Sequence, residues 1–163
     1  MSPRPEWLPE MIETNGVWDS VCETLYGVFH QDFVLGKPIL LGLPVWWNRK
    51  IRDGRFEEAF WHLITQLDEA GVERLFDPRR AERLPWCGPS IRNAHEPSLL
   101  VWDFKEGNGV IRTYIWYRAG DYVIVLEKKQ QRGGLIAFLV TAHHIEREGR
   151  RRSLEAKYQK RVL

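Results

Sequence analysis

The chain has very little cysteine and no long hydrophobic run. Its 163 residues include two cysteines, Cys22 and Cys87, whose separation matches no metal-ligand spacing. No apolar stretch approaches the roughly 18 residues of a membrane-spanning helix, and the polar, proline-broken residues 1–9 do not resemble a signal peptide. We therefore expect a cytoplasmic protein with reduced thiols and no membrane partner.

The familiar catalytic and cofactor-binding motifs are also missing. The sequence contains no phosphate-loop signature, no G-x-G-x-x-G, no H-E-x-x-H and no nucleophile elbow. The adjacent His143 and His144 are expected to point to opposite faces of a strand, so they are poorly placed to bind one metal ion. We expect neither a cofactor nor a metal site.

The chain is rich in aromatic residues, and its charge is unevenly distributed. Eight tryptophans, five tyrosines and seven phenylalanines favour a packed core, and the length suits one domain. The net charge is only +2, but Arg147 to Arg161 contains seven basic and two acidic residues. A second basic cluster contains Arg74, Arg79, Arg80, Arg83 and Arg92. Such local density can attract a polyanion.

The first half of the chain predicts two helices. Apolar residues at helical spacing indicate a helix from about Val17 to His30, and a second stripe predicts a helix from about Phe56 to a C-cap at Gly71. Between them, "GKPILLGLPVWWN" suits a short edge strand or an extended arm, because proline and glycine interrupt it. His62 falls outside the apolar stripe of the second helix. Residues 74–98 are expected to be irregular.

The second half has the period of strands. Four runs, "LLVWDFK", "VIRTYIWYR", "DYVIVLEKK" and "LIAFLVTAHHIE", are separated by short turn signals and predict a four-stranded antiparallel meander. "GRRRSLEAKYQKR" then predicts a basic C-terminal helix. The expected fold class is α+β, with the meander packed against an N-terminal helix, an extra N-terminal helical region and the closing basic helix.

The end of the last strand is a candidate site. Strict alternation places Leu139, Thr141 and His143 on one face, and Val140, Ala142 and His144 on the other. A hydroxyl and an imidazole would then share a face at the edge of an apolar run. The alternative is that Thr141 is simply a strand former and His143 a solvated strand end.

The basic segments are candidates for phosphate binding. In the C-terminal helix the candidates are Arg150, Arg151, Arg152, Lys157 and Tyr158, and in the irregular segment they are Arg79, Arg80 and Arg83. Arginine binds phosphate oxygens in a bidentate manner and stacks on bases. The alternatives are a solvated terminal helix and arginines that only cover apolar surface.

Several stretches resemble a known group. "FWHLI", "DPRRAERLPW" with "SIRN", "TYIWYRAGDYVIVLEKK" and "FLVTAHHIE…RRRSLEAKYQKR" are similar to bacterial and prophage proteins of the Barnase–EndoU–colicin–RelE-like nuclease superfamily. The resemblance covers residues 56–161. It implies an N-terminal helix against a four-stranded antiparallel sheet in a domain of residues 55–163, preceded by an extension of residues 1–54.

The resemblance also implies an activity, which is metal-independent RNA cleavage by toxin-like enzymes. The ribose 2′-OH attacks the adjacent phosphate, so that the products carry a 2′,3′-cyclic phosphate and a 5′-OH. Such chemistry needs proton transfer and cations on the phosphoryl oxygens. We expect His62 to transfer a proton, Arg83 to clamp the oxyanion, Thr141 to hydrogen-bond the phosphate and His143 to be the second proton-transfer group.

Two other functions fit the same sequence. A catalytically inert module could bind RNA or DNA through the basic helix, with a steep dependence on salt. A prophage accessory factor could instead bind a protein through the aromatic N-terminal region. For the nuclease, the expected partners are RNA (messenger, transfer or ribosome-associated) and an antitoxin or second copy bound by residues 1–54.

Overall fold

The computed structural model describes residues 3–51 and 54–163 and confirms the α+β class. In these ranges the α-helices are α1 Trp18–Phe29, α2 Glu58–Ile64, α3 Pro78–Glu82, α4 Leu84–Arg92 and α5 Glu148–Gln159. The strands are β1 Ile39–Leu40, β2 Leu43–Trp46, β3 Thr65–Leu67, β4 Arg74–Phe76, β5 Leu100–Lys105, β6 Ile111–Tyr117, β7 Tyr122–Gln131 and β8 Gly134–His144. A π-helical segment, His30–Leu35, extends α1, and a 3-10 turn, Arg118–Gly120, precedes β7.

The main sheet has six strands in the order β1-β2-β8-β7-β6-β5. Strands β5 to β8 are consecutive antiparallel neighbours, as their turn signals indicate, but β2 pairs with β8 in parallel. The prediction of a four-stranded antiparallel sheet is therefore wrong, because the sheet is larger and mixed. Leu41 and Gly42 adopt positive φ angles of 45° and 90°, so β1 and β2 form a tight hairpin that extends the sheet beside β8.

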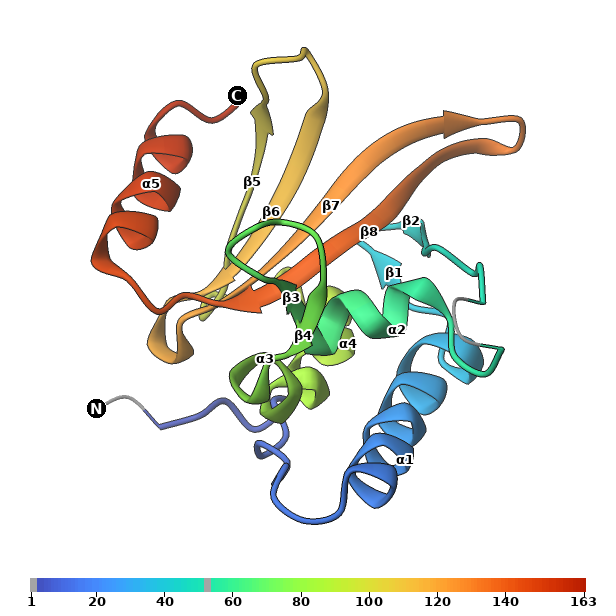
Figure 1. The fold of residues 1–163 in the computed structure, drawn as a ribbon. Coiled ribbons are helices and arrows are strands. Elements are labelled where there is room, and N and C mark those ends of the chain that lie inside the picture. The colour runs from blue at the N-terminus through green and yellow to red at the C-terminus, as the bar shows by residue number, and fades with distance from the viewer. Residues whose placement is uncertain (1–2, 52–53) are drawn as a thin grey trace.

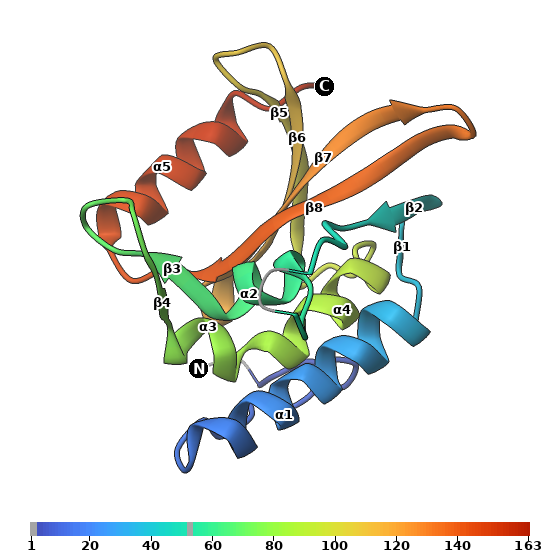
Figure 2. The ribbon, with the colours of Figure 1, turned by 45° about the vertical axis from the view of Figure 1, so that its right-hand side comes forward.

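Helices cover both faces of this curled sheet (Figure 1). One face, called here the first face, packs against α1, α2, α3 and α4 and holds the larger core. The opposite or second face packs against α5 and holds a smaller core built around Trp102, Trp116 and Leu154. Figure 2 shows α5 on the side of the sheet opposite α1 and α4.

The N-terminal residues share the larger core. Helix α1 begins and ends within one residue of its prediction, and it buries Val21, Leu25 and Phe29. The Phe29 and Phe60 rings lie 5.7 Å apart between centroids, which joins α1 to α2. Residues 1–54 therefore contribute α1 to the same core as the rest of the chain, and β1 and β2 to the same sheet.

The expected helix from Phe56 to Gly71 is wrong beyond Ile64. Helix α2 ends there, and Thr65 adopts an extended conformation that opens the β3–β4 hairpin. Gly71 does have a positive φ of 71°, but it lies in the hairpin turn rather than at a helix end. The apolar stripe could not show this, because Leu67 matches the helical spacing and yet is exposed in β3.

Residues 74–98 are more regular than expected. Strand β4 is followed by α3, whose N-cap Asp77 accepts hydrogen bonds from the backbone N–H groups of Arg79 and Arg80. Of the prolines that suggested irregularity, Pro78 and Pro85 lie in first helical turns, where proline is tolerated, Pro89 lies inside α4, and Pro97 lies in the turn before β5. No helix of the described residues is both long and apolar enough to cross a bilayer.

Replacement of Phe60 by alanine tests the shared core. Phe60 is fully buried and touches Tyr26, Phe29 and Phe56, so Phe60→Ala should lower the free energy of unfolding by about 3–5 kcal/mol. Denaturant unfolding measures this change. Val72→Ala, at a position 77% exposed in the hairpin turn, is the control and should change it by no more than about 0.5 kcal/mol. Equal effects would contradict the packing.

Candidate active site

Strands β7 and β8 change register beside the expected site. Val125 pairs with Thr141, but the next residue of β7, Leu126, pairs with Leu139. Val140 is therefore an extra residue in β8, which makes a β-bulge. A bulge of this kind bends its strand and re-aims the side chains around it.

The bulge leaves Thr141 and His143 on the second face. Residues directly opposite each other in an antiparallel pair point to the same side of a sheet. Thr141 lies opposite Val125, and His143 lies opposite Val123; both valines belong to the second core. The prediction that Thr141 and His143 share a face is confirmed.

The prediction is also confirmed for Ala142 and His144, which lie opposite Ile124 and Tyr122 of the first core, but it is wrong for Leu139 and Val140. Leu139 lies opposite Leu126 in the first core, so it faces away from Thr141 rather than beside it. Val140 packs against the second core, whereas Ala142 faces the first. Strict alternation fails here because the bulge adds one residue between Leu139 and Thr141.

A cleft of about 360 Å³ lies between the β3–β4 hairpin and β8. We call it the hairpin cleft. It is lined by His62, Gln66, Leu67, Arg74, Arg80, Val140, Thr141 and Arg150. Five elements and the bulge thus bring together an imidazole, a hydroxyl and three guanidinium groups that are far apart in the sequence.

The hairpin is held in place by Arg74, which sequence reasoning noted in a basic cluster but did not assign to the site. Its Nε donates to Thr65 Oγ1, and its Nη2 donates to the Thr65 carbonyl oxygen, each at 2.8 Å. Thr65 is the residue at which α2 ends and β3 begins. Arg74 therefore fixes the junction between α2, which carries His62, and β3, which carries Gln66, and both residues line the cleft.

Arg80 also stabilises the junction between α2 and β3. Its Nη1 donates to the carbonyl oxygens of His62 at 3.2 Å and Thr65 at 2.7 Å, and its Nε lies 3.4 Å from Asp77 Oδ2. Burial lowers the pKa of Arg80, although Asp77 acts in the opposite direction. Arginine stays charged in proteins even so. Arg80 is therefore a largely buried cation with a fixed position.

Two residues on the rim of the cleft are more accessible. His62 Nε2 lies 3.9 Å from Glu58 Oε2, one helical turn earlier in α2. Arg150, in the first turn of α5, is exposed, and its guanidinium forms no hydrogen bond or ion pair with any of the described residues. Thus Arg150 is the cation of the cleft that has capacity for an external anion.

A second hollow, of about 410 Å³, continues from the hairpin cleft and shares Gln66, Leu67, Arg80 and Arg150 with it. His143, His144 and Arg147 line it together with the acidic side chains of the hairpin. His143 is mostly buried there, and its Nε2 has no hydrogen-bond partner among the described residues. His143 Nε2 is thus a buried nitrogen with unused hydrogen-bonding capacity near the charges of Arg80 and Arg150.

The charge state of His143 follows from this position. Burial, the positive charges of Arg80 and Arg150, and the neighbouring His144 together lower the pKa of His143 to about 4. Burial also lowers the pKa of His144, with Arg83 and Arg79 acting in the same direction. His143 is therefore neutral at neutral pH.

The structure does not bring Arg83 into either hollow. Its Nη1 donates to the Arg79 carbonyl and to Glu82 Oε1, and its guanidinium lies 5.5 Å from the Trp86 ring centroid. Only 12% of its side chain is exposed. Arg83 thus contacts the first core, while Arg80, one helical turn earlier, reaches the cleft. Arg79 lies outside the hairpin cleft, where its Nε is 3.6 Å from Glu146.

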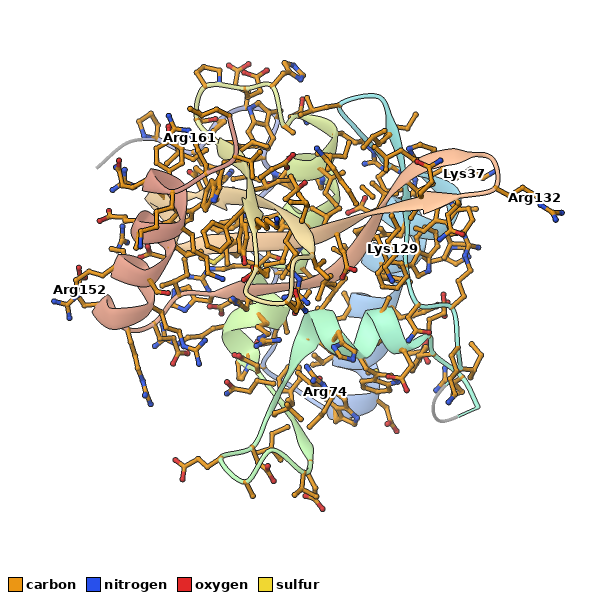
Figure 3. The ribbon with its side chains drawn as sticks, turned by 90° about the horizontal axis from the view of Figure 1, so that it is seen from above. Lys37, Arg74, Lys129, Arg132, Arg152 and Arg161 are labelled. Carbon is orange, nitrogen blue, oxygen red and sulfur yellow. The ribbon has the colours of Figure 1, made fainter. Side chains whose placement is uncertain are left out.

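Two of the four basic residues of α5, Arg151 and Lys157, bind other parts of the chain. Arg151 pairs with Asp121, and Lys157 Nζ lies 3.2 Å from Glu106 and 2.8 Å from Tyr114 Oη. Tyr158 packs edge-on against Trp102 in the second core. Figure 3 shows Arg152 at the outer edge of α5, pointing away from the sheet. Of the α5 candidates, only Arg150 lines the cleft.

Comparison of the chain with family models, with curated proteins and with solved structures finds no match. The resemblance to the nuclease superfamily therefore stays a prediction. Among the residues that the structure describes, no group of three or more histidine, cysteine, aspartate or glutamate side chains is arranged to hold a metal ion.

The lowered pKa of His143 predicts an acid-sensitive fold. Between about pH 6.5 and pH 4 an unfolded chain binds a proton at this histidine and the folded chain does not, so stability falls as the pH falls. The full effect is at most about 3 kcal/mol. Denaturant unfolding of His143→Asn at pH 7 and pH 5 should show a smaller loss than the parent protein.

The exposed His95 provides the control for that experiment. His95→Asn should keep the acid-dependent loss of the parent protein, because His95 lies on the surface beside Glu96. If His143→Asn loses as much stability between the two pH values as the parent does, His143 is not the buried neutral group described here.

Proposed function

We propose that the protein is a metal-independent, toxin-like endoribonuclease. In this reaction a base removes the proton of a ribose 2′-OH, and the oxygen attacks the adjacent phosphorus. The bond to the 5′ oxygen breaks, and an acid protonates that leaving oxygen. The products carry a 2′,3′-cyclic phosphate and a 5′-OH. The proposal needs proton-transfer groups and cations around one phosphate.

The observation that carries the proposal is the convergence of His62, Thr141, Arg80 and Arg150 on the hairpin cleft. The resemblance named His62 and Thr141, which are separated by about half of the 163-residue chain, and they line the same cleft. The order of a helix followed by the consecutive antiparallel strands β5 to β8 also supports the superfamily assignment.

We assign proton transfer to His62, because it is half-buried at the rim and Glu58 can stabilise its protonated form. His143 is a weaker base at its low pKa, but a bound phosphate would favour its protonated form and let it donate to an oxygen. Thr141 can donate a hydrogen bond to the phosphate.

We assign stabilisation of the negative charge of the transition state to two arginines. Arg80 is held by Asp77 and two carbonyl groups, so it is preorganised, whereas Arg150 is free to close on a phosphate. In this proposal they replace Arg83 as the oxyanion clamp, because Arg83 contacts Trp86 and Glu82 outside the cleft.

The internal pairing of α5 disfavours the inert binding module. A basic helix that binds nucleic acid needs cations that face outward. Arg151 and Lys157 instead pair with Asp121 and Glu106. The accessory-factor reading is disfavoured in a similar way, because the apolar side of α1 is buried in the chain's own core.

Cleavage of RNA by the purified protein in EDTA tests the proposal. His62→Ala should slow cleavage by roughly 100- to 10,000-fold, the usual contribution of a proton-transfer group. His95→Ala is the matched control and should retain activity, because His95 lies at the surface beside Glu96. If messenger, transfer and ribosomal RNA all stay intact with the parent protein, the proposal fails.

Two arginines of α5 give a sharper comparison. Arg150→Ala should slow cleavage by on the order of 100-fold, because it removes a cation that stabilises the phosphoryl oxygens. Arg152→Ala removes the same charge two residues away, from a side chain that points away from the sheet (Figure 3) and does not line the cleft, and should cost little. Equal losses in single-turnover cleavage rates would show that the basic segment acts only through its overall charge.

A further inference from the structure

Two aromatic side chains continue the second face of the sheet beyond the hairpin cleft. Trp46 of β2 pairs with Phe138 of β8, while the preceding pair, Val45 and Ala137, is buried in the first core. Because side chains alternate along a strand, Trp46 and Phe138 lie together on the opposite, second face. Trp46 is 45% exposed, and in the described ranges its indole ring has no aromatic, cationic or hydrogen-bonding partner.

The β-bulge aligns these rings with the cleft. Phe138 lies opposite Glu127, and Thr141 lies opposite Val125; Glu127 and Val125 are two residues apart on one face of β7. Phe138 and Thr141 thus share a face, although they are three residues apart and a regular strand would separate them. The distance between them along β8 is about 10 Å. A strand of nucleic acid in the cleft would reach the rings within a few nucleotides.

The charge next to the rings is positive. Lys129 Nζ lies 4.5 Å from the centroid of the Phe138 ring. Arg132 projects from the tip of the β7–β8 hairpin, and Lys129 lies on the same hairpin closer to the sheet (Figure 3). The acidic residue of this strip, Glu127, is directly opposite Arg112 of β6, which offsets its charge.

From this arrangement we propose that Trp46, Phe138 and Lys129 form a platform for single-stranded RNA that flanks the scissile phosphate. The inference rests on the proposed ribonuclease function and adds the strandedness of the substrate. Bases stack on aromatic side chains only when they are unpaired, and a cation beside the rings, here Lys129, can contact the backbone. A duplex would keep its bases away from Trp46.

Binding of an uncleavable oligonucleotide tests the platform. The probe is a fluorescein-labelled, single-stranded 2′-O-methyl RNA of about 12 nucleotides, measured by anisotropy with the full chain. Trp46→Ala should raise the Kd by roughly 5- to 100-fold, since each stacked base contributes about that much. Trp46→Phe keeps a ring and should restore most of the affinity. Lys129→Ala should reduce the salt dependence of binding.

Trp18 is the matched control. It is 43% exposed, almost the same as Trp46, but it lies on α1 and packs edge-on against Phe76. Trp18→Ala should leave the Kd unchanged. The proposal is overturned if the two alanine variants bind equally well, if a duplex of the same sequence binds as tightly as the single strand, or if the parent protein binds no single-stranded RNA.

Failure of the platform and failure of the ribonuclease proposal give different results. If RNA is cleaved and Trp46→Ala changes neither the Kd nor the KM, the platform is wrong and the catalytic site stands. If single-stranded RNA binds in a Trp46-dependent manner but no RNA is cleaved, the platform stands and the ribonuclease proposal is wrong. In that second case the protein is an RNA-binding module that uses the sheet rather than α5.

Discussion

The extra residue Val140 in β8 is the constraint on which the candidate site depends. It turns Leu139 into the first core and leaves Thr141 and His143 on the second face. Without it, Phe138 would lie on the first face, and the strip from Trp46 to the cleft would be broken. Because β8 also joins β2 in parallel, the same strand positions both the cleft and the proposed RNA platform.

The arginines show how position determines what a charge can do. Arg74 and Arg80 hold the junction between α2 and β3 through hydrogen bonds to Thr65, so the cleft is built partly from its own cations. Arg151 fixes α5 to the turn before β7 through Asp121. Arg150 differs from these, because it lines the cleft and its guanidinium forms no hydrogen bond or ion pair with the described residues.

Periodicity predicted the elements whose shape depends on local pattern, which are α1, the strands β5 to β8 and α5. It failed where contacts between residues distant in sequence determine the structure. At Thr65, for example, hydrogen bonds from Arg74 and Arg80 stabilise the end of α2, which the apolar stripe does not predict. It missed the bulge at Val140 for the same reason. The sequence also predicted Arg83, rather than Arg80, as the oxyanion clamp. The orientation of these arginines depends on the short helix α3, which the prolines of this segment made hard to predict.

The most direct measurement of the central claim is an NMR titration of the histidine side chains with uncleavable single-stranded 2′-O-methyl RNA. If RNA occupies the hairpin cleft and the hollow that continues from it, the imidazole signals of His62 and His143 should shift in parallel as RNA is added. Those of His95, on the surface beside Glu96, should stay in place. Saturable RNA binding with no change at His62 or His143 would contradict the account, because the RNA would then bind elsewhere on the molecule.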